Sequence, residues 1–582
     1  MKRLIAIILL FAAWPAIAAD LNGYTAQYEC RAGNSNCNVD VATLTAQACH
    51  QTIAVGDAWS TINWSNNVIC LANGDHTAKG TLALGSSGTS GTRKVLRYYR
   101  ASDNDDEPWN MSDANKAKIY RIDSDNKAYW IIHRLNMQGG SVFGSPVLQQ
   151  EQVYIHNGSN NIILNRMYFT KFTADGSLGM VFIKDTTTQY IWVQNSVFWD
   201  PPPNGVGVGT DNWGVYIEGG TFHRIVNNEM RNNTGAFLPN ITAGYQTDGS
   251  VFENNDAYVT SAYYTDCTGT FNVVGKCSAT RGGMDFKSCG TAANPVKVIH
   301  NRIWGQRVTD INVAATSTSS GSGGTWSTDL PETNRQCDYH IYQNNIIMNT
   351  QYGFLTTRTN PNNNSAVGNL IYDIQDFNQN TTPITAGESA GLSIYYGNQT
   401  EYYLNTIIGA KGKWAIFGGV IDLDLRCNVI IDSGAKSGTP GTGSVVDYNT
   451  YYGTPDSGEA NKLGNYVLNT RANSTAYSLG AIIRTTATPP ANGTAGDFLY
   501  KVTTAGISAG STPTYTTTLG GTTTDGTMVV TAIRGPYSFY RKLRTSAELT
   551  YIPYARAHSS APESLFCPST YAGRTGIGIG DE

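Results

Sequence analysis

Charged residues are scarce in this sequence, and it contains no cluster of basic residues. Only 14% of the 582 residues are Asp, Glu, Lys or Arg, and the formal net charge is −4. A nucleic-acid partner normally requires a basic surface to hold the phosphates, so we expect none. The chain is instead rich in glycine and tyrosine, with 61 and 34 residues. This composition favours strands and turns over helices.

Long apolar runs are missing after the N-terminus. Lys2 and Arg3 precede an apolar stretch, Leu4–Trp14, that is too short to span a bilayer comfortably, and residues 16–18 read Ala-Ile-Ala. This pattern predicts a cleaved signal peptide over residues 1–18, with an uncleaved anchor as the alternative. We therefore expect a secreted, periplasmic or cell-surface protein without membrane insertion.

The ten cysteines include no CxxC pair, and no histidine lies at zinc-site spacing from them, which argues against a zinc site. An even number of cysteines in an exported chain instead favours disulfides. The pairs that the spacing suggests, beginning with the two most local, are Cys30/Cys37, Cys267/Cys277, Cys49/Cys70 and Cys289/Cys337.

One short pattern recurs along the chain: an apolar residue, any residue, Asn, any residue, and a second apolar residue. The centres of its copies, degenerate ones included, are Asn165, Asn195, Asn228, Asn254, Asn301, Asn344, Asn369, Asn405, Asn428 and Asn449. Most intervals between them are 21 to 36 residues, a period that indicates a solenoid. The apolar residues alternate with period two, which indicates strands. We therefore predict an all-β fold, a right-handed parallel β-helix of about ten or more coils.

Asparagine suits the sharp turns of such a solenoid for two reasons. It tolerates a left-handed backbone better than most residues. Coils stacked about 4.8 Å apart also bring successive Asn amides close enough to form a hydrogen-bonded ladder. We expect the same asparagines to serve both purposes.

The ends of the chain predict further parts. Residues 41–50 follow Asp40, a suitable N-cap, and are predicted to form a short helix that covers the open first coil. The β-helix domain is expected over residues 19–470, and a small Thr/Gly-rich β module over 471–535. Residues 536–582 are expected to pack back on the β-helix.

Several stretches within residues 56–98 resemble the opening coils of secreted β-helix polysaccharide lyases. They are Gly56-Asp57-Ala58-Trp59, Val68–Gly74, Lys79–Leu82 and Lys94–Tyr98. With the asparagine repeat, the resemblance covers residues 50–455. Lyases of this kind, such as alginate, chondroitin and pectate lyases, cleave uronic-acid polysaccharides by β-elimination. The resemblance implies that a base removes the C5 proton while a cation or calcium stabilises the enolate. The module at 471–535 resembles a small β module of phage tail and secreted surface proteins, and its role could be carbohydrate binding or spacing.

Two intervals of the repeat are long, 47 and 43 residues on either side of Asn301, and indicate insertions over residues 258–281 and 308–336. The first contains Tyr263 and Tyr264, and the second contains Trp326. Loops of this kind on a rigid solenoid can form the walls of a binding groove, and aromatic side chains suit sugar rings. Tolerated surface loops are the alternative.

A strand near these insertions combines opposite charges. In residues 283–289, inward Met284 and Phe286 turn Asp285 and Lys287 outward on one strand face. We aligned the equivalent strands of other coils by their leading glycines. This alignment places Glu218, Lys287, Thr357 and Tyr395 in one outward column, and Tyr216, Asp285 and Ser393 in the other.

The resemblance implies roles for these residues. Residues 285–289 and 304–307 look like the Lys-then-Arg arrangement of the alginate and chondroitin lyases of this fold, in which Lys287 would be the base and Arg307 its partner. The substrate-binding residues would be Glu218, Tyr216, Tyr263, Tyr264, Arg358 and Tyr395. Calcium, if required, would be held by Asp285, Asp248 and Asp310. The alternative for Lys287 is a solvated lysine that pairs with Asp285.

Two other functions remain open. One is a non-catalytic carbohydrate-binding or adhesive β-helix of a cell surface or phage spike. The other is a glycoside hydrolase, which needs two carboxylates about 5–9.5 Å apart. Glu218 and Asp285 are expected two coils, or about 10 Å, apart, which is long for that reaction. In every case we expect a polysaccharide as substrate or ligand.

Overall fold

The computed structural model describes a set of segments that together trace most of the solenoid and the C-terminal module. The described residues are 33–99, 116–138, 151–170, 178–199, 212–231, 238–239, 247–258, 284–286, 290–304, 323–327, 338–348, 352–356, 362–372, 374, 390–394, 397–410, 412–431, 433–447, 449–452, 466–485 and 498–534. The predicted signal peptide at 1–18 and the predicted C-terminal segment at 536–582 lie outside them.

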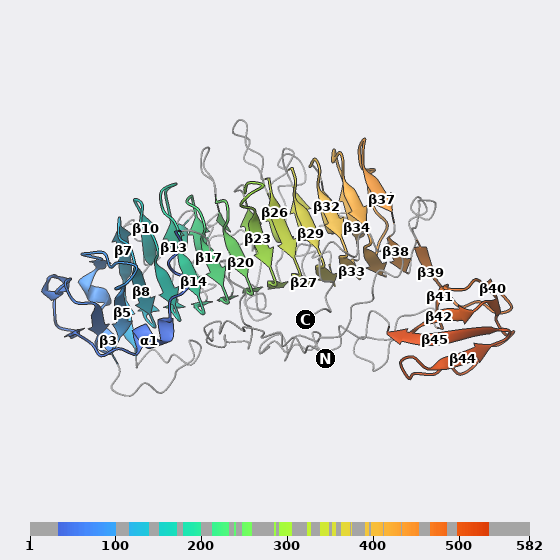
Figure 1. Ribbon diagram of the computed structural model, residues 1–582, viewed down its shortest axis with the longest axis horizontal. Coiled ribbons are helices and arrows are strands. Elements are labelled where there is room, and N and C mark those ends of the chain that lie inside the picture. The colour runs from blue at the N-terminus through green and yellow to red at the C-terminus, as the bar shows by residue number, and fades with distance from the viewer. Residues whose placement is uncertain are drawn as a thin grey trace, which may run out of the picture.

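The chain forms a right-handed parallel β-helix, as predicted, with parallel strands stacked along three sides (Figure 1). Sheet A is continuous along the solenoid and has 14 strands. They are β1 (Gln51–Ile53), β2 (Val68–Leu71), β5 (Lys94–Tyr98), β8 (Trp130–His133), β11 (Ile163–Asn165), β14 (Trp192–Gln194), β17 (Arg224–Val226), β20 (Val251–Glu253), β23 (Val296–Ile299), β26 (His340–Gln343), β29 (Ser365–Val367), β32 (Glu401–Tyr403), β35 (Asp424–Arg426) and β37 (Val445–Asp447).

Sheet B follows sheet A within each coil and also pairs in parallel from coil to coil. Its strands are β3 (Gly74–Asp75), β6 (Ala117–Ile119), β9 (Asn136–Met137), β12 (Tyr168–Phe169), β15 (Val197–Trp199), β18 (Glu229–Arg231), β21 (Asp256–Tyr258), β24 (Arg302–Trp304), β27 (Ile346–Met348), β30 (Leu370–Tyr372), β33 (Thr406–Ile408), β36 (Val429–Ile431), β38 (Thr450–Tyr452) and β39 (Tyr466–Thr470).

The third side is divided into two sheets that lie end to end. Sheet C contains β4 (Thr81–Ala83), β7 (Arg121–Asp125), β10 (Val153–His156), β13 (Leu178–Ile183), β16 (Asn212–Ile217) and β19 (Leu238–Pro239). Sheet D continues it with β22 (Met284–Phe286), β25 (Gly323–Ser327), β28 (Tyr352–Thr356), β31 (Ala390–Ile394) and β34 (Lys413–Phe417).

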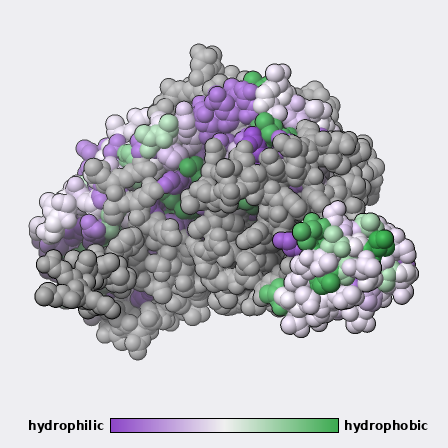
Figure 2. Space-filling view, turned by 45° about the vertical axis from the view of Figure 1, so that its right-hand side comes forward, coloured by the Kyte–Doolittle hydropathy of each residue, from purple (hydrophilic) through white to green (hydrophobic). Residues whose placement is uncertain are grey.

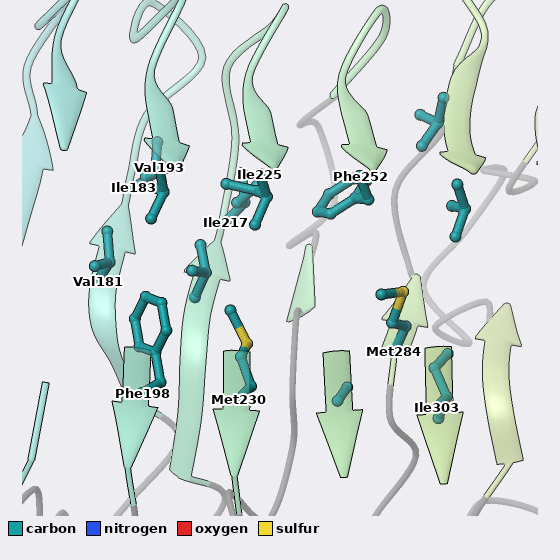
Figure 3. Close-up of a cluster of buried hydrophobic side chains, with 14 of the residues drawn as sticks. Val181, Ile183, Val193, Phe198, Ile217, Ile225, Met230, Phe252, Met284 and Ile303 are labelled. Atoms are coloured by element: carbon teal, nitrogen blue, oxygen red, sulfur yellow. The ribbon is translucent and has the colours of Figure 1, made fainter. Parts of the chain in front are cut away.

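The core is the apolar filling between the three sides. Figure 3 shows Val193 and Ile225 from sheet A, Val181 from sheet C, and Phe198 and Met230 from sheet B pointing toward one another. All five are at most 2% exposed. Every second residue of these short strands is apolar, so each coil buries a layer of side chains. Burial of one such side chain contributes about 1.5–3 kcal/mol, which makes stacking of coils the main source of stability.

The corner between sheets A and B confirms the predicted asparagine ladder but corrects its membership. The buried column is Asn228, Asn255, Asn301, Asn345, Asn369, Asn405, Asn428 and Asn449. Each amide nitrogen donates to the oxygen of the next amide at 2.9–3.0 Å. In earlier coils the same position holds Leu135, Met167 and Ser196, which are also buried.

The residues of the buried ladder up to Asn428 directly follow left-handed residues. The left-handed asparagines form a second, shorter row, in which Asn195 donates to Asn165, Asn227 to Asn195 and Asn254 to Asn227 at 2.6–2.9 Å, so these three serve both purposes, as we predicted. Asn195, Asn254 and Asn344 have φ values of 52°, 51° and 53°, and each directly precedes the inward residue. Asn165 lies within strand β11. These four predicted centres are therefore outside the buried ladder. The buried ladder consists of the following residues because a left-handed residue changes the chain direction, which turns the next side chain inward.

The N-terminal segment packs on the outside of sheet A. Helix α1 (Val41–Thr45) is capped by Asp40, whose Oδ1 accepts from the backbone N–H of Thr43 at 3.0 Å. Around the helix, Cys37, Val41 and Leu44 contribute to an apolar cluster with Val68, Val95, Ile131 and Ile163 of sheet A. We predicted a longer helix, over residues 41–50, that covers the open first coil. The observed contacts are with the side of the coil stack.

Two short 3-10 helices, η1 (Trp59–Thr61) and η2 (Thr77–Lys79), lie in the first coils. A disulfide joins Cys49 to Cys70 in β2, as the sequence suggested, with a Cα–Cα distance of 5.7 Å. Cys427 is also disulfide-bonded. The other suggested pairs include cysteines outside the described residues. None of the helices among the described residues is long and apolar enough to cross a membrane.

The C-terminal module follows the last coil and consists of two small sheets, one of four strands and one of two. Its strands are β40 (Ala476–Tyr477), β41 (Ile482–Arg484), β42 (Phe498–Thr504), β43 (Gly506–Ile507), β44 (Thr522–Asp525) and β45 (Met528–Arg534). Strand β39 joins the two parts because it pairs with β38 of sheet B and with β41 of the module. Figure 2 shows apolar side chains on the module surface, where Leu479, Ile507 and Leu519 are at least half exposed.

A buried ion pair holds the module together. The Arg471 guanidinium donates to both carboxylate oxygens of Asp525 at 2.6 and 2.9 Å, and the Tyr515 hydroxyl also donates to Asp525. Burial alone would raise the pKa of Asp525, but the hydrogen bonds from Arg471, Tyr515 and the Ala509 backbone outweigh it and hold the pKa at about 2.

Candidate functional site

The outer face of sheet C carries two columns of side chains that run along the solenoid axis. The first contains Asp123, Tyr154, Phe182 and Tyr216, and the second contains Asp125, His156, Lys184 and Glu218. The residues between the columns, such as Ile155 and Ile183, are buried in the core. Because side chains alternate across a strand, the two columns lie on the outside. We call them the aromatic column and the charged column.

Stacked rings fill the aromatic column. The ring centroids of Tyr154 and Phe182 are 5.5 Å apart, and those of Phe182 and Tyr216 are 4.6 Å apart, with planes within 27° of each other. The imidazole of His156, two residues further along β10, stacks on the Tyr154 ring, with 4.0 Å between the ring centroids. Because each ring lies against a neighbour, the column has little ring face left on which a sugar could stack. Tyr216, a predicted substrate-binding residue, is only 5% exposed.

The charged column contains an ion pair between its last two members. The Lys184 ammonium lies 3.8 Å from the Glu218 carboxylate, and the two side chains are 39% and 16% exposed. Burial raises the pKa of Glu218, and the nearby Lys184 charge opposes that effect. Glu218, also predicted to bind substrate, therefore lies on the outer face but is engaged by Lys184.

A histidine and an aspartate from adjacent coils form a second pair, which the sequence analysis missed. His156 Nε2 lies 2.9 Å from Asp123 Oδ1. Arg121 lies 3.5 Å from Asp123 and 3.1 Å from Glu151, and its guanidinium is 5.3 Å from the centre of the Tyr154 ring. The sequence does show Tyr154 and His156 alternating with apolar residues. Their pairing with Asp123, about one coil earlier, depends on the register between coils.

Two polar groups around the His156–Asp123 pair could bind a ligand. Among the described residues, neither Nδ1 of His156 nor the hydroxyl of Tyr154 has a hydrogen-bond partner. Burial raises the pKa of Tyr154, although the nearby Lys184 charge opposes the shift. The hydroxyl is therefore protonated at neutral pH and can donate a proton. Because the Asp123 carboxylate only accepts, Nε2 carries a proton, and Nδ1 is the ring nitrogen that can take one up.

In sheet D the register confirms part of the predicted alignment. Asp285, Trp326, Leu355 and Ser393 occupy one column across β22, β25, β28 and β31. Asp285 and Ser393 therefore share a column, as expected. The predicted insertion over residues 308–336 needs correction, because Gly323–Ser327, with Trp326, forms strand β25 of the sheet. The strand resembles a loop in sequence because it is rich in Gly, Ser and Thr.

The other predicted site residues lie outside the described residues. They are the expected base Lys287, its partner Arg307, the substrate-binding residues Tyr263, Tyr264, Arg358 and Tyr395, and the calcium ligand Asp310. For Asp285, the backbone is described but not the side chain. The structure therefore neither brings these residues together nor separates them.

The third predicted calcium ligand, Asp248, lies at the corner that leads into sheet A. Its carbonyl oxygen accepts from the Phe222 backbone N–H at 3.1 Å, which places Asp248 opposite Thr221 of the preceding coil. Thr221 is three residues after Glu218, so Asp248 does not belong to the charged column. Among the described residues, no group of three His, Cys, Asp or Glu side chains could hold a metal ion. The described acidic residues thus do not form a calcium site.

Comparisons with known proteins match no family model and no curated protein. Among solved structures, a mannuronic acid specific polysaccharide family 6 lyase from human gut microbiota is 12% identical over 72% of this chain and 82% of its own, with a TM-score of 0.41. An alginate lyase from Paenibacillus sp. is 11% identical over 69% and 99%, with a TM-score of 0.28. The Streptococcus pneumoniae surface adhesin PfbA is 12% identical over 72% and 100%, with a TM-score of 0.36. Likenesses this distant assign no activity.

Proposed function

We propose that this chain is an exported polysaccharide lyase that cleaves a uronic-acid polymer by β-elimination on the outer face of sheets C and D. One observation supports this most: the Lys184 ammonium, 39% exposed, stands beside the aromatic column of a rigid sheet, 5.9 Å from the centre of the Phe182 ring. β-Elimination needs a cation at the uronate carboxylate, where negative charge develops as the C5 proton leaves.

The base that the family resemblance implies is Lys287, with Arg307 as its partner. Lys287 directly follows β22, and Asp285 in that strand belongs to the column shared with Ser393. A lysine base must have a lowered pKa, which requires partial burial or a second cation nearby. In this proposal Tyr263, Tyr264, Arg358 and Tyr395 contact the polymer, and Asp285, Asp248 and Asp310 are the residues to test for calcium.

The experiment is an assay of the purified protein on alginate, polygalacturonate, chondroitin sulfate and hyaluronan. We expect release of unsaturated products that absorb in the ultraviolet, and its loss in Lys287→Ala. The assay is repeated with added calcium and with a chelator to test metal dependence. If no polymer of the panel yields such products, and Lys287→Ala binds polymer as the wild type does, the lyase function is wrong.

A non-catalytic carbohydrate-binding protein is the second candidate. It is favoured by the pairing of charges on the described outer face, where Lys184 pairs with Glu218 and Arg121 with Glu151. Paired charges suit a binding surface because pairing holds their hydrogen-bond donors and acceptors in fixed positions, where sugar hydroxyl groups can meet them. Polymer binding without unsaturated products in the same assay would favour this candidate.

A further inference from the structure

The pair of His156 and Asp123 has the geometry of an oriented general base. Asp123 Oδ1 lies 2.9 Å from Nε2, which fixes the proton on that nitrogen and leaves Nδ1 to accept one. The His156 side chain is 14% exposed, so its ring is mostly buried but still reaches the surface. A histidine kept only for packing would more often have both nitrogens engaged.

The neighbours of His156 supply the other groups that β-elimination needs. Lys184 follows it in the charged column, one coil on, and can face a uronate carboxylate. The Tyr154 ring stacks on the imidazole at 4.0 Å, with its hydroxyl uncommitted among the described residues. The Arg121 guanidinium, 5.3 Å from that ring, would stabilise a tyrosinate.

We propose that His156 and Tyr154 form a catalytic centre for β-elimination, an inference that rests on the proposed lyase function. His156 Nδ1 takes the C5 proton of a uronate whose carboxylate pairs with Lys184. The electrons of the broken C5–H bond form the C4–C5 double bond, and the C4–O bond breaks. The leaving oxygen takes the hydroxyl proton of Tyr154. The imidazolium then returns a proton to the tyrosinate through solvent, so both groups are restored.

This centre is separate from the one expected at Lys287. Strands β10 and β22 are four coils apart, which corresponds to about 19 Å along the axis. One sugar residue cannot contact both. The two centres are therefore alternatives. Only one of them can supply the base, so only one of His156→Gln and Lys287→Ala is expected to lower kcat about 100-fold.

The test compares His156→Gln, Tyr154→Phe, Asp123→Asn and Lys287→Ala with the wild type on the four acidic polymers named above. Glutamine can keep a hydrogen bond to Asp123 but cannot act as a base. We expect His156→Gln to lower kcat about 100-fold or more and to change KM less than about threefold. As a positioning residue, Asp123 affects kcat less, so Asp123→Asn is expected to lower it about 10-fold.

His300→Asn is the matched control, because adjacent coils carry Asn254 and Asn344 at the same left-handed corner position. It should leave kcat unchanged. If His156→Gln is unstable, Asp123→Asn tests the centre instead: a kcat about 10-fold lower supports it, and an unchanged kcat contradicts it. If His156→Gln keeps more than half of the wild-type kcat while Lys287→Ala loses activity, this centre is wrong and the lyase function stands. If the wild type cleaves none of the polymers, the lyase function and this centre both fail.

Discussion

Two corners of each coil share one backbone plan but differ in their side chains. At both, a residue of positive φ precedes a residue that turns inward, as Phe222 precedes His223 before sheet A and His300 precedes Asn301 before sheet B. Before sheet A the inward residues are mixed, and include Ile191, His223, Ser250, His340, Asn364, Thr400 and Leu423. Before sheet B they are asparagine in every coil from Asn228 to Asn449.

The difference shows that the turn itself does not require asparagine. Left-handed backbone occurs at Tyr190, Phe222, Gln399 and Leu404 as well as at asparagines. What the inward asparagines add is hydrogen bonding, because each amide links two coils through side chain and backbone. The corner before sheet B therefore carries a continuous row of amide hydrogen bonds. At the corner before sheet A only some inward side chains, such as His223 and Asn364, bond the adjacent coil, and apolar residues such as Ile191 stand at this position in other coils.

The largest expected effect is that of removing one amide from the ladder. Asn301 donates to Asn345 Oδ1 and to the Phe252 carbonyl, and its own Oδ1 accepts from the backbone and side chain of Asn255. Asn301→Ala leaves these buried partners unpaired, which should cost about 4 kcal/mol of unfolding free energy. Guanidinium unfolding followed by circular dichroism measures the loss.

Thr400→Val at the other corner is the matched control. The Thr400 hydroxyl is buried and has no partner among the described residues, so its replacement by an isosteric methyl should change stability by less than about 1 kcal/mol. Equal costs for Asn301→Ala and Thr400→Val would show that the ladder contributes no more than packing does.

A pH effect is expected at the corner before sheet A. Burial lowers the pKa of His223 to about 4, against a slight opposing effect of its contact with the Gly219 carbonyl. Because the folded pKa lies below the unfolded value of about 6.5, protons bind preferentially to the unfolded chain. The contribution of His223 to the free energy of unfolding is therefore fully present above about pH 6.5. It falls by up to about 3 kcal/mol as the pH drops to 4.

His223→Ile isolates this contribution, since the preceding coil carries Ile191 at the same position. The substitution loses the hydrogen bond from the Ile191 backbone N–H to Nδ1 and is destabilising at pH 7.5. Its unfolding free energy should nevertheless depend less on pH than that of the wild type. If the difference in unfolding free energy between the wild type and His223→Ile is the same at pH 7.5 and pH 4.5, His223 is not a neutral buried imidazole whose pKa is lowered.

The solenoid was predictable because the same residue types recur from coil to coil. The prediction was wrong where the backbone turn recurs but the side chains differ. Asn-Asn pairs such as Asn254-Asn255 and Asn344-Asn345 do not reveal which residue turns inward. The choice depends on the left-handed residue before it, and that position tolerates many side chains. The corner before sheet A has the same geometry but mixed residues, so the sequence gives no periodic signal there.

The candidate site was predictable only within single strands. Alternation placed Tyr216 and Glu218 on the outer face, where the structure has them. The pairing of His156 with Asp123 joins residues 33 positions apart, and coil lengths vary from 21 to 46 residues along the ladder. Without a fixed repeat length, the partner in the next coil cannot be read from the sequence.

The smallest expected effect is a gain of stability at the corner before sheet B. Leu404 has a φ of 56° at the position where Asn227 and Asn254 stand in other coils. A left-handed backbone costs a residue such as leucine about 1–2 kcal/mol, and asparagine avoids part of that cost. Leu404→Asn should therefore stabilise the protein by about 1 kcal/mol, which a rise in the guanidinium midpoint would show. The flanking coils carry Gly368 and Cys427, which offer no amide, so any gain reflects the backbone alone. A lower midpoint would mean that the partly buried Leu404 side chain contributes more through packing than its backbone costs.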